Sequence, residues 1–172
     1  MKKIRLPKGK VSDHPGVAIL QALHDLAACE RSKRYKINMC DWHSGAGGFG
    51  PKCEVCFAGA VMAKTLKCDL SSDHSPWDGH FDDDASNKLV GLDHAREGEW
   101  CDFLFSFKVP VEMRGALRDM LWDKFKDHPD YDYDKRAFKI RMRSVALLLL
   151  RHLKLSKGVF SLRGLKTSDI SA

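Results

Sequence analysis

The chain has 172 residues, of which 44% are hydrophobic and 30% are charged. This composition is typical of a globular protein and argues against an intrinsically disordered chain, and the length predicts one domain. The longest apolar runs, at 55–63 and 145–150, are much shorter than the ~20 residues of a membrane-spanning helix. No apolar stretch follows the basic N-terminus, so the sequence does not predict a signal peptide. We therefore expect a cytoplasmic protein that does not enter a membrane, with its six cysteines reduced.

The formal charge of +6 conceals an uneven distribution along the chain. Residues 1–40 carry nine basic and three acidic side chains, residues 41–109 carry six and twelve, and residues 110–172 carry fourteen and eight. Clustered charge, more than total charge, attracts an oppositely charged partner. A nucleic acid is therefore expected to meet only the terminal thirds of the chain, and a charged protein is the alternative partner.

Hydrophobic periodicity predicts a mainly α, single compact helical domain with at most a small β element. We expect this domain to span residues 13–160, after a basic N-terminal arm (1–12) and before a C-terminal tail (161–172). Asp13 and Pro15 are typical of the start of the first helix, with Asp13 as its capping carboxylate.

The further elements follow in chain order from periodicity and from turn-forming residues. An extended segment is expected at 35–39, a glycine-rich loop at 45–51, a polar loop at 69–86, and helices at 53–67, 85–97, 110–127 and 135–155. Residues 100–107 fit either a strand or a second helix after Gly98. Gly158 is expected to end the last helix.

The sharpest local pattern is Cys40-Asp-Trp-His43, followed after nine residues by Cys53-Glu-Val-Cys56. Zn²⁺ prefers four thiolate and imidazole ligands, and a two-residue gap lets both members of a pair reach one ion. The glycine-rich loop between the pairs allows them to fold together. The pattern therefore predicts one structural zinc ion held by Cys40, His43, Cys53 and Cys56. Cys53 is expected in the first turn of a helix, where the helix dipole favours its thiolate.

Other interpretations of these residues stay open. Free cysteines are often inert core residues, Cys53-x-x-Cys56 has the spacing of a redox dithiol, and His43 with Cys53 has the composition of a hydrolase pair. A further set fits a metal-dependent phosphohydrolase or a second ion site; its members are His24, Asp25, Cys68, His74, His80, Asp82, Asp83, Asp84, Asp93 and His94.

Basic residues are concentrated on the helices expected in the C-terminal third. Arg136, Lys139 and Arg143 recur at helical spacing and so share one face. Such a face contacts phosphates or is simply a solvated helix surface. The candidate residues for binding a partner or a nucleic acid are Arg114, Arg118, Lys135, Arg136, Lys139 and Arg143.

Four motifs occur together between residues 35 and 105. They are Ile37-Asn38-Met39, Trp42-His43, Cys53-x-Val55-Cys56-x-Ala58-Gly59-Ala60-Val61-Met62-Ala63 and Leu89-x-x-Leu92-Asp93-x-Ala95-Arg96-x-Gly98. Together they resemble a family of small uncharacterised proteins encoded by tailed bacteriophages. The resemblance implies expression in a bacterial cytoplasm during infection and a role as an accessory, host-takeover or anti-defence factor. It supplies no catalytic residues.

The sequence contains no coherent catalytic set. We therefore expect an interaction protein that binds a host protein or a nucleic acid through its segregated charged surfaces. The alternatives are a zinc-stabilised nucleic-acid-binding module and an enzyme, either a His/Asp metal-dependent phosphohydrolase or a Cys–His hydrolase.

Overall fold

Helices make up most of the chain in the computed structural model, which describes residues 4–46, 52–126 and 130–163. The helices are α1 (Pro15–Arg31), α2 (Phe57–Lys64), α3 (Asp83–Glu97), α4 (Trp100–Ser106), α5 (Val111–Phe125) and α6 (Lys135–His152). The strands are β1 (Tyr35–Ile37), β2 (His43–Ser44), β3 (Cys53–Val55), β4 (Leu153–Ser156) and β5 (Val159–Leu162). A mainly α domain with two small sheets confirms the predicted class. The start of the predicted arm (1–3), most of the glycine-rich loop (47–51) and the predicted tail beyond residue 163 lie outside the described residues.

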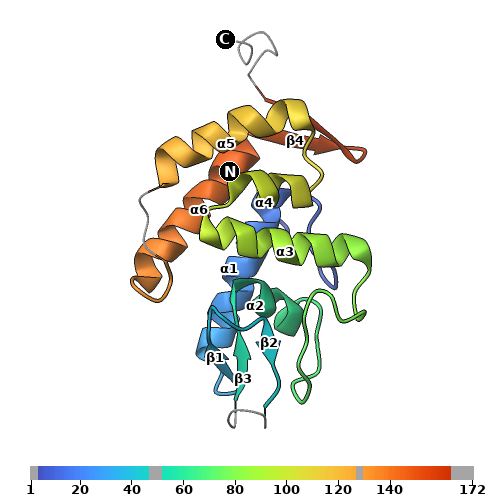
Figure 1. Ribbon diagram of the computed structural model, residues 1–172, viewed down its shortest axis with the longest axis vertical. Coiled ribbons are helices and arrows are strands. Elements are labelled where there is room, and N and C mark those ends of the chain that lie inside the picture. Colours follow the sequence, from blue (N-terminus) through green and yellow to red (C-terminus); the bar gives the residue numbers. More distant parts are fainter. Residues whose placement is uncertain (1–3, 47–51, 127–129, 164–172) are drawn as a thin grey trace.

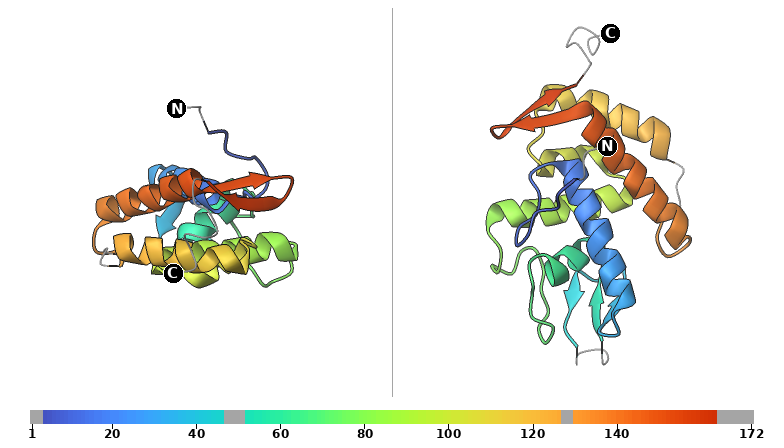
Figure 2. Two further views of the ribbon diagram at one scale, coloured as in Figure 1. Left: turned by 90° about the horizontal axis from the view of Figure 1, so that it is seen from above. Right: turned by 180° about the vertical axis from the view of Figure 1, so that it is seen from behind.

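The helices form two layers with α2 between them. In one layer α1 packs along α6, and the β4–β5 hairpin continues from α6; the other layer contains α3, α4 and α5 (Figures 1 and 2). All residues of α2 from Phe57 to Ala63 are buried. A Cβ added at Gly59 would lie 1.5 Å from the carbonyl oxygen of Trp42, so only glycine allows this close approach.

The first helix is capped differently from the prediction. The His14 side chain, not Asp13, accepts the hydrogen bond from the Gly16 amide, at 3.1 Å. Asp13 instead pairs with the buried ammonium of Lys88 on α3, at 2.6 Å. The carboxylate therefore ties the end of the N-terminal arm to the opposite helical layer.

A three-stranded sheet of order β1-β3-β2 stands at one end of the molecule (Figure 1). β3 runs parallel to β1 and antiparallel to β2, with His43 opposite Val55. The predicted helix over 53–67 is therefore wrong at its start, because Cys53 and Val55 alternate inward as a strand and α2 begins only at Phe57.

The C-terminal end of α6 also differs from the prediction. The helix ends at His152, and alternation along 153–162 forms the β4–β5 hairpin in place of a continued helix. Lys157 and Gly158 both have positive φ, as the tight turn of a hairpin requires. Gly158 is thus a turn residue and not the end of the helix. Residues 100–106, which fitted either structure, form α4.

Among the described residues, no helix combines the length and apolar character needed to cross a bilayer.

Candidate functional site

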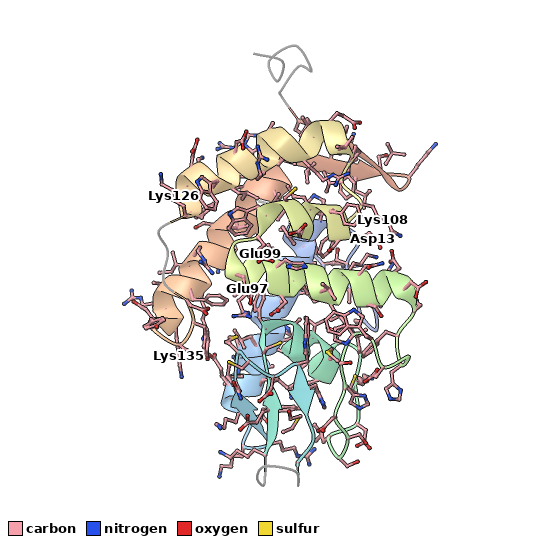
Figure 3. The ribbon with its side chains drawn as sticks, in the orientation of Figure 1. Asp13, Glu97, Glu99, Lys108, Lys126 and Lys135 are labelled. Carbon is pink, nitrogen blue, oxygen red and sulfur yellow. The ribbon has the colours of Figure 1, made fainter. Side chains whose placement is uncertain are left out.

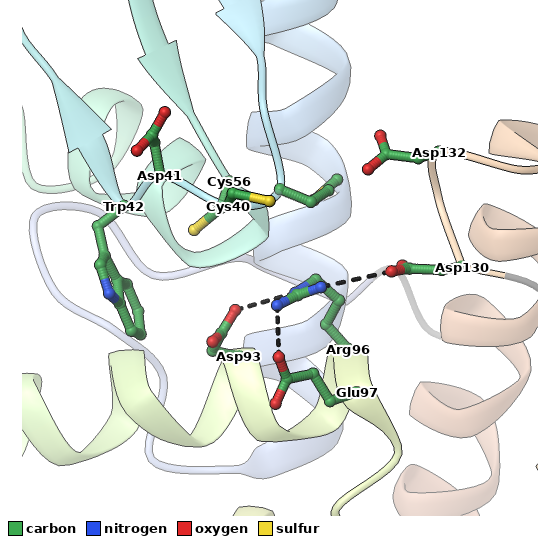
Figure 4. Close-up of a pocket in the computed structure, with 10 residues that line it drawn as sticks. Cys40, Asp41, Trp42, Cys56, Asp93, Arg96, Glu97, Asp130 and Asp132 are labelled. Atoms are coloured by element: carbon green, nitrogen blue, oxygen red, sulfur yellow. Dashed lines mark hydrogen bonds and ion pairs between the residues drawn. The ribbon is translucent and has the colours of Figure 1, made fainter.

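The four predicted zinc ligands divide into two pairs. His43 on β2 and Cys53 on β3 face each other, with 3.5 Å between Cys53 Sγ and His43 Nε2. Cys40 and Cys56 line a separate hollow beside α3 (Figure 4). In the part of the chain that the structure describes, the four side chains do not form one group of converging ligand atoms.

The two inner cysteines have different environments. Cys56 is the N-cap of α2, where its sulfur accepts the Gly59 amide at 3.3 Å. Burial raises the pKa of Cys56 to about 12 and that of Cys53 to about 11. The expected activation of the Cys53 thiol by a helix dipole is wrong, because Cys53 lies in strand β3 and not at the start of a helix. Both thiols stay protonated near neutral pH, which disfavours redox or nucleophilic chemistry, since the thiolate is the reactive form.

Two histidines of the loop between α2 and α3, His74 and His80, lie beside His43 on β2. The His74 amide donates a hydrogen bond to the His43 carbonyl at 2.8 Å, which brings the loop between α2 and α3 against β2. Ring centroids lie 5.1 Å apart for His43 and His74, and 4.8 Å apart for His74 and His80. The ligand atoms of His74, Asp78 and His80 lie within 4.8 Å of one another. We call His43, Cys53, His74 and His80 the histidine cluster.

His74 is the unusual member of this cluster. It is 9% exposed, and neither of its ring nitrogens has a hydrogen-bond partner. The nearest carboxylate, that of Asp78, lies 3.9 Å from Nδ1. Leaving a buried polar group unpaired costs about 1–3 kcal/mol. Burial, with the neighbouring His74, lowers the pKa of His43, so that its imidazole is neutral and keeps a lone pair.

A second group of three close ligand atoms comes from His94, Glu97 and Glu99. Its members already have partners in the protein. His94 Nδ1 lies 2.5 Å from a Glu99 carboxylate oxygen, and Glu97 pairs with Arg96 at 2.7 Å. The two glutamates are exposed, so this group is explained as surface ion pairs.

Arg96 occupies the centre of the hollow that Cys40 and Cys56 line, which has a volume of about 350 Å³ (Figure 4). Its guanidinium pairs with Asp93 at 2.9 Å, Glu97 at 2.7 Å and Asp130 at 3.5 Å. We call this set the Arg96 network. It joins α3 to the segment that precedes α6, and its charges are largely satisfied within the protein.

The exposed side of α6 carries a row of arginine and aliphatic side chains. Spacings of three and four residues place the row on one face of the helix, and its members are Arg136, Ile140, Arg143, Leu147 and Arg151. Among the described residues, no carboxylate lies within ion-pair distance of the three arginines. We call this row the α6 stripe.

The other predicted basic residues are more constrained. Lys139 beside the stripe pairs with Glu30 at 2.5 Å, and Lys135 lies 5.3 Å above the Tyr131 ring at the edge of the molecule (Figure 3). Lys135, Arg136, Lys139, Ile140 and Arg143 together line a shallow hollow of about 580 Å³.

Arg114 and Arg118 belong to α5, in the other layer (Figure 2). Arg114 stacks on the Phe105 ring at 5.1 Å, and Arg118 pairs with Asp119 at 2.7 Å. The six predicted binding residues are thus four on α6 and two on α5, on helices with different packing partners.

Sequence reasoning missed two features of these sites. It did not join His74 and His80 to His43 and Cys53, although the spacing of His74 and His80 had marked them as ligand candidates. It also omitted Arg151, which continues the helical repeat of Arg136 and Arg143.

No protein-family model, curated protein or solved structure matches the chain.

Proposed function

We propose that the protein binds nucleic acid through the α6 stripe, by contact with the phosphate backbone. The observation that carries this proposal is the row of Arg136, Arg143 and Arg151 on an exposed helix face without acidic partners among the described residues. Guanidinium groups bind phosphate oxygens through two parallel hydrogen bonds, which makes arginine a favoured phosphate ligand.

The distribution of acidic groups supports this face as the contact surface. Asp93 and Glu97 lie on α3, in the layer opposite α6, where they pair with Arg96 (Figure 2). These two carboxylates therefore do not lie on the exposed face of α6.

Binding without catalysis agrees with the raised thiol pKa values of Cys53 and Cys56. We propose the setting that the sequence resemblance implies, an accessory factor of a tailed bacteriophage in its host's cytoplasm. There the protein would act by binding to host or phage nucleic acid, without changing it chemically.

The test is the salt dependence of binding to a fluorescent double-stranded DNA fragment. The logarithm of the association constant falls against the logarithm of salt concentration with a slope of roughly −0.9 per phosphate contact. Replacing Arg136, Arg143 and Arg151 together by Gln is expected to reduce the slope by roughly two to three and to weaken binding at low salt.

Arg118→Gln is the matched control, because this arginine is already paired with Asp119 on α5. It is expected to leave the slope unchanged. Wild-type binding that is insensitive to salt, or an unchanged slope in the triple variant, would refute the proposal and leave a protein partner for this face.

A further inference from the structure

We propose that His74, Asp78 and His80, all in the loop between α2 and α3, bind one zinc ion. We call these three residues the loop site. The sequence spacing marks His74 and His80 together with Cys68 as ligand candidates, and the loop site keeps both histidines but has Asp78 in place of Cys68. The site lies beside the three-stranded sheet and is independent of nucleic-acid binding by α6.

The ligand atoms of the loop site converge. They lie within 4.8 Å of one another, and His74 Nδ1 is 3.9 Å from a carboxylate oxygen of Asp78. Zinc bonds of about 2.05 Å at tetrahedral angles separate two ligand atoms by about 3.3 Å and the centroids of two bound imidazoles by about 5.2 Å. The ring centroids of His74 and His80 are 4.8 Å apart. Because Asp78 and His80 are exposed, their side chains can close the small distance that remains.

The unpaired imidazole of His74 is an independent indication of a ligand. Buried polar side chains normally have hydrogen-bond partners, whereas both ring nitrogens of His74 lack one at 9% exposure. The Asp78 carboxylate is too far from Nδ1 for a hydrogen bond. Without an ion the unpaired imidazole lowers the stability of the fold. An ion between His74 and Asp78 would bind the lone pair of one ring nitrogen and offset part of this cost.

The loop holds two of the three ligands in place. The His74 amide donates to the His43 carbonyl at 2.8 Å, which fixes the start of the loop site against β2. Asp78 accepts hydrogen bonds from the amides of Ser75 at 2.7 Å and His80 at 3.3 Å, one on each carboxylate oxygen. Each carboxylate oxygen has two lone pairs, so the oriented carboxylate keeps the capacity to bind a cation.

The neighbouring His43 and Cys53 do not belong to the site. Cys53 Sγ lies 3.5 Å from His43 Nε2 and 3.8 Å from Nδ1, so the sulfur does not point along the lone pair of either nitrogen. The second group of close ligand atoms also differs from the loop site. There His94 Nδ1 is already paired with Glu99 at 2.5 Å, whereas the nitrogens of His74 are unpaired.

The ligand types select zinc from the common divalent cations. Two imidazoles and one carboxylate are a ligand set of zinc, whereas Mg²⁺ and Ca²⁺ prefer oxygen ligands throughout. Three protein ligands leave a fourth position to water. Since Asp78 and His80 are exposed, this position faces solvent. We therefore infer an open site from which the ion can exchange, unlike a closed structural zinc site.

The experiment measures zinc affinity of the metal-free full chain by competition with a chromophoric chelator. We expect one equivalent of Zn²⁺ to bind and Mg²⁺ not to compete. Even the outer-shell partners of metal ligands contribute about 10–100-fold to affinity. His80→Ala, Asp78→Asn and His74→Gln are therefore each expected to weaken zinc binding at least about tenfold. His80 is exposed, so His80→Ala is expected to stay folded, and circular dichroism checks this for each variant.

His94→Ala and Cys53→Ser are the matched controls, and both are expected to bind zinc as the wild type does. Co²⁺ in place of zinc is expected to give visible absorption without a thiolate-to-cobalt charge-transfer band. Failure of the wild type to bind one equivalent of zinc would overturn the proposal. Unchanged affinity in His80→Ala, or a thiolate charge-transfer band, would overturn it as well, because either result would place the ion on other ligands.

Discussion

The Arg96 network and the histidine cluster lie on either side of the short segment from Cys53 to Cys56. They differ in whether their buried polar groups have partners within the protein. Arg96 is nearly buried, yet three carboxylates surround its guanidinium (Figure 4). His74 is buried to a similar degree, yet neither ring nitrogen has a hydrogen bond. A satisfied network keeps its charges paired within the protein, whereas each unpaired buried polar group costs stability. This difference separates a stabilising ion-pair network from a cluster that lowers the stability of the fold.

The largest expected effect is the loss of the Arg96 side chain. Arg96→Met leaves Asp93, Glu97 and Asp130 close together without their shared cation. Arg96 is mostly buried, but Glu97 and Asp130 are partly exposed to solvent. The cost is therefore smaller than for a fully buried pair, and we expect about 1.5–3 kcal/mol; urea denaturation measures the decrease in the free energy of unfolding. Arg118→Met, at an exposed pair, is expected to cost less than about 1 kcal/mol. Equal effects for the two variants would show that the Arg96 network is not a buried one.

His74→Leu is expected to change the stability in the opposite direction from Arg96→Met. The substitution removes two unpaired nitrogens from a buried position, and we expect a gain of about 1–2 kcal/mol in the free energy of unfolding, measured by urea denaturation. A clear loss of stability would mean that the His74 imidazole has hydrogen bonds in solution.

A smaller effect on stability is expected from pH through His43. Burial lowers the folded-state pKa of this histidine below its usual 6.5. Above pH 6.5 both states are neutral; as the pH falls below 6.5 the unfolded chain takes up the proton first, so stability decreases until the pH reaches the lowered value. His43→Gln should have a shallower decrease between pH 6.5 and 5 than the wild type in parallel denaturation curves. Identical slopes would contradict the assigned environment.

Periodicity was sufficient to predict the class of the fold and most of its helices. The helices α1, α3, α5 and α6 each bury an apolar face, and such a face repeats within the local sequence. The strand β3 escaped prediction because its three residues are held by pairing with β1 and β2 on both sides. Pairing of this kind depends on distant segments and overrides the local helical pattern.

The candidate sites also differ in whether their residues are close together in the sequence. The α6 stripe lies on one helix, so most of it could be predicted from spacing alone. The histidine cluster joins a strand pair to a loop more than twenty residues further along the chain. The C-x-x-C spacing pointed to Cys56 as a ligand, whereas the fold uses its sulfur to cap α2. Two cysteines three positions apart, Cys53 and Cys56, therefore have different surroundings.

The salt dependence of DNA binding tests the central claim most directly. We predict that binding of the wild-type chain weakens steeply as the salt concentration rises, and that the variant with Arg136, Arg143 and Arg151 replaced by Gln has a slope smaller by roughly two to three. Equal slopes for the wild type and this variant would contradict the account.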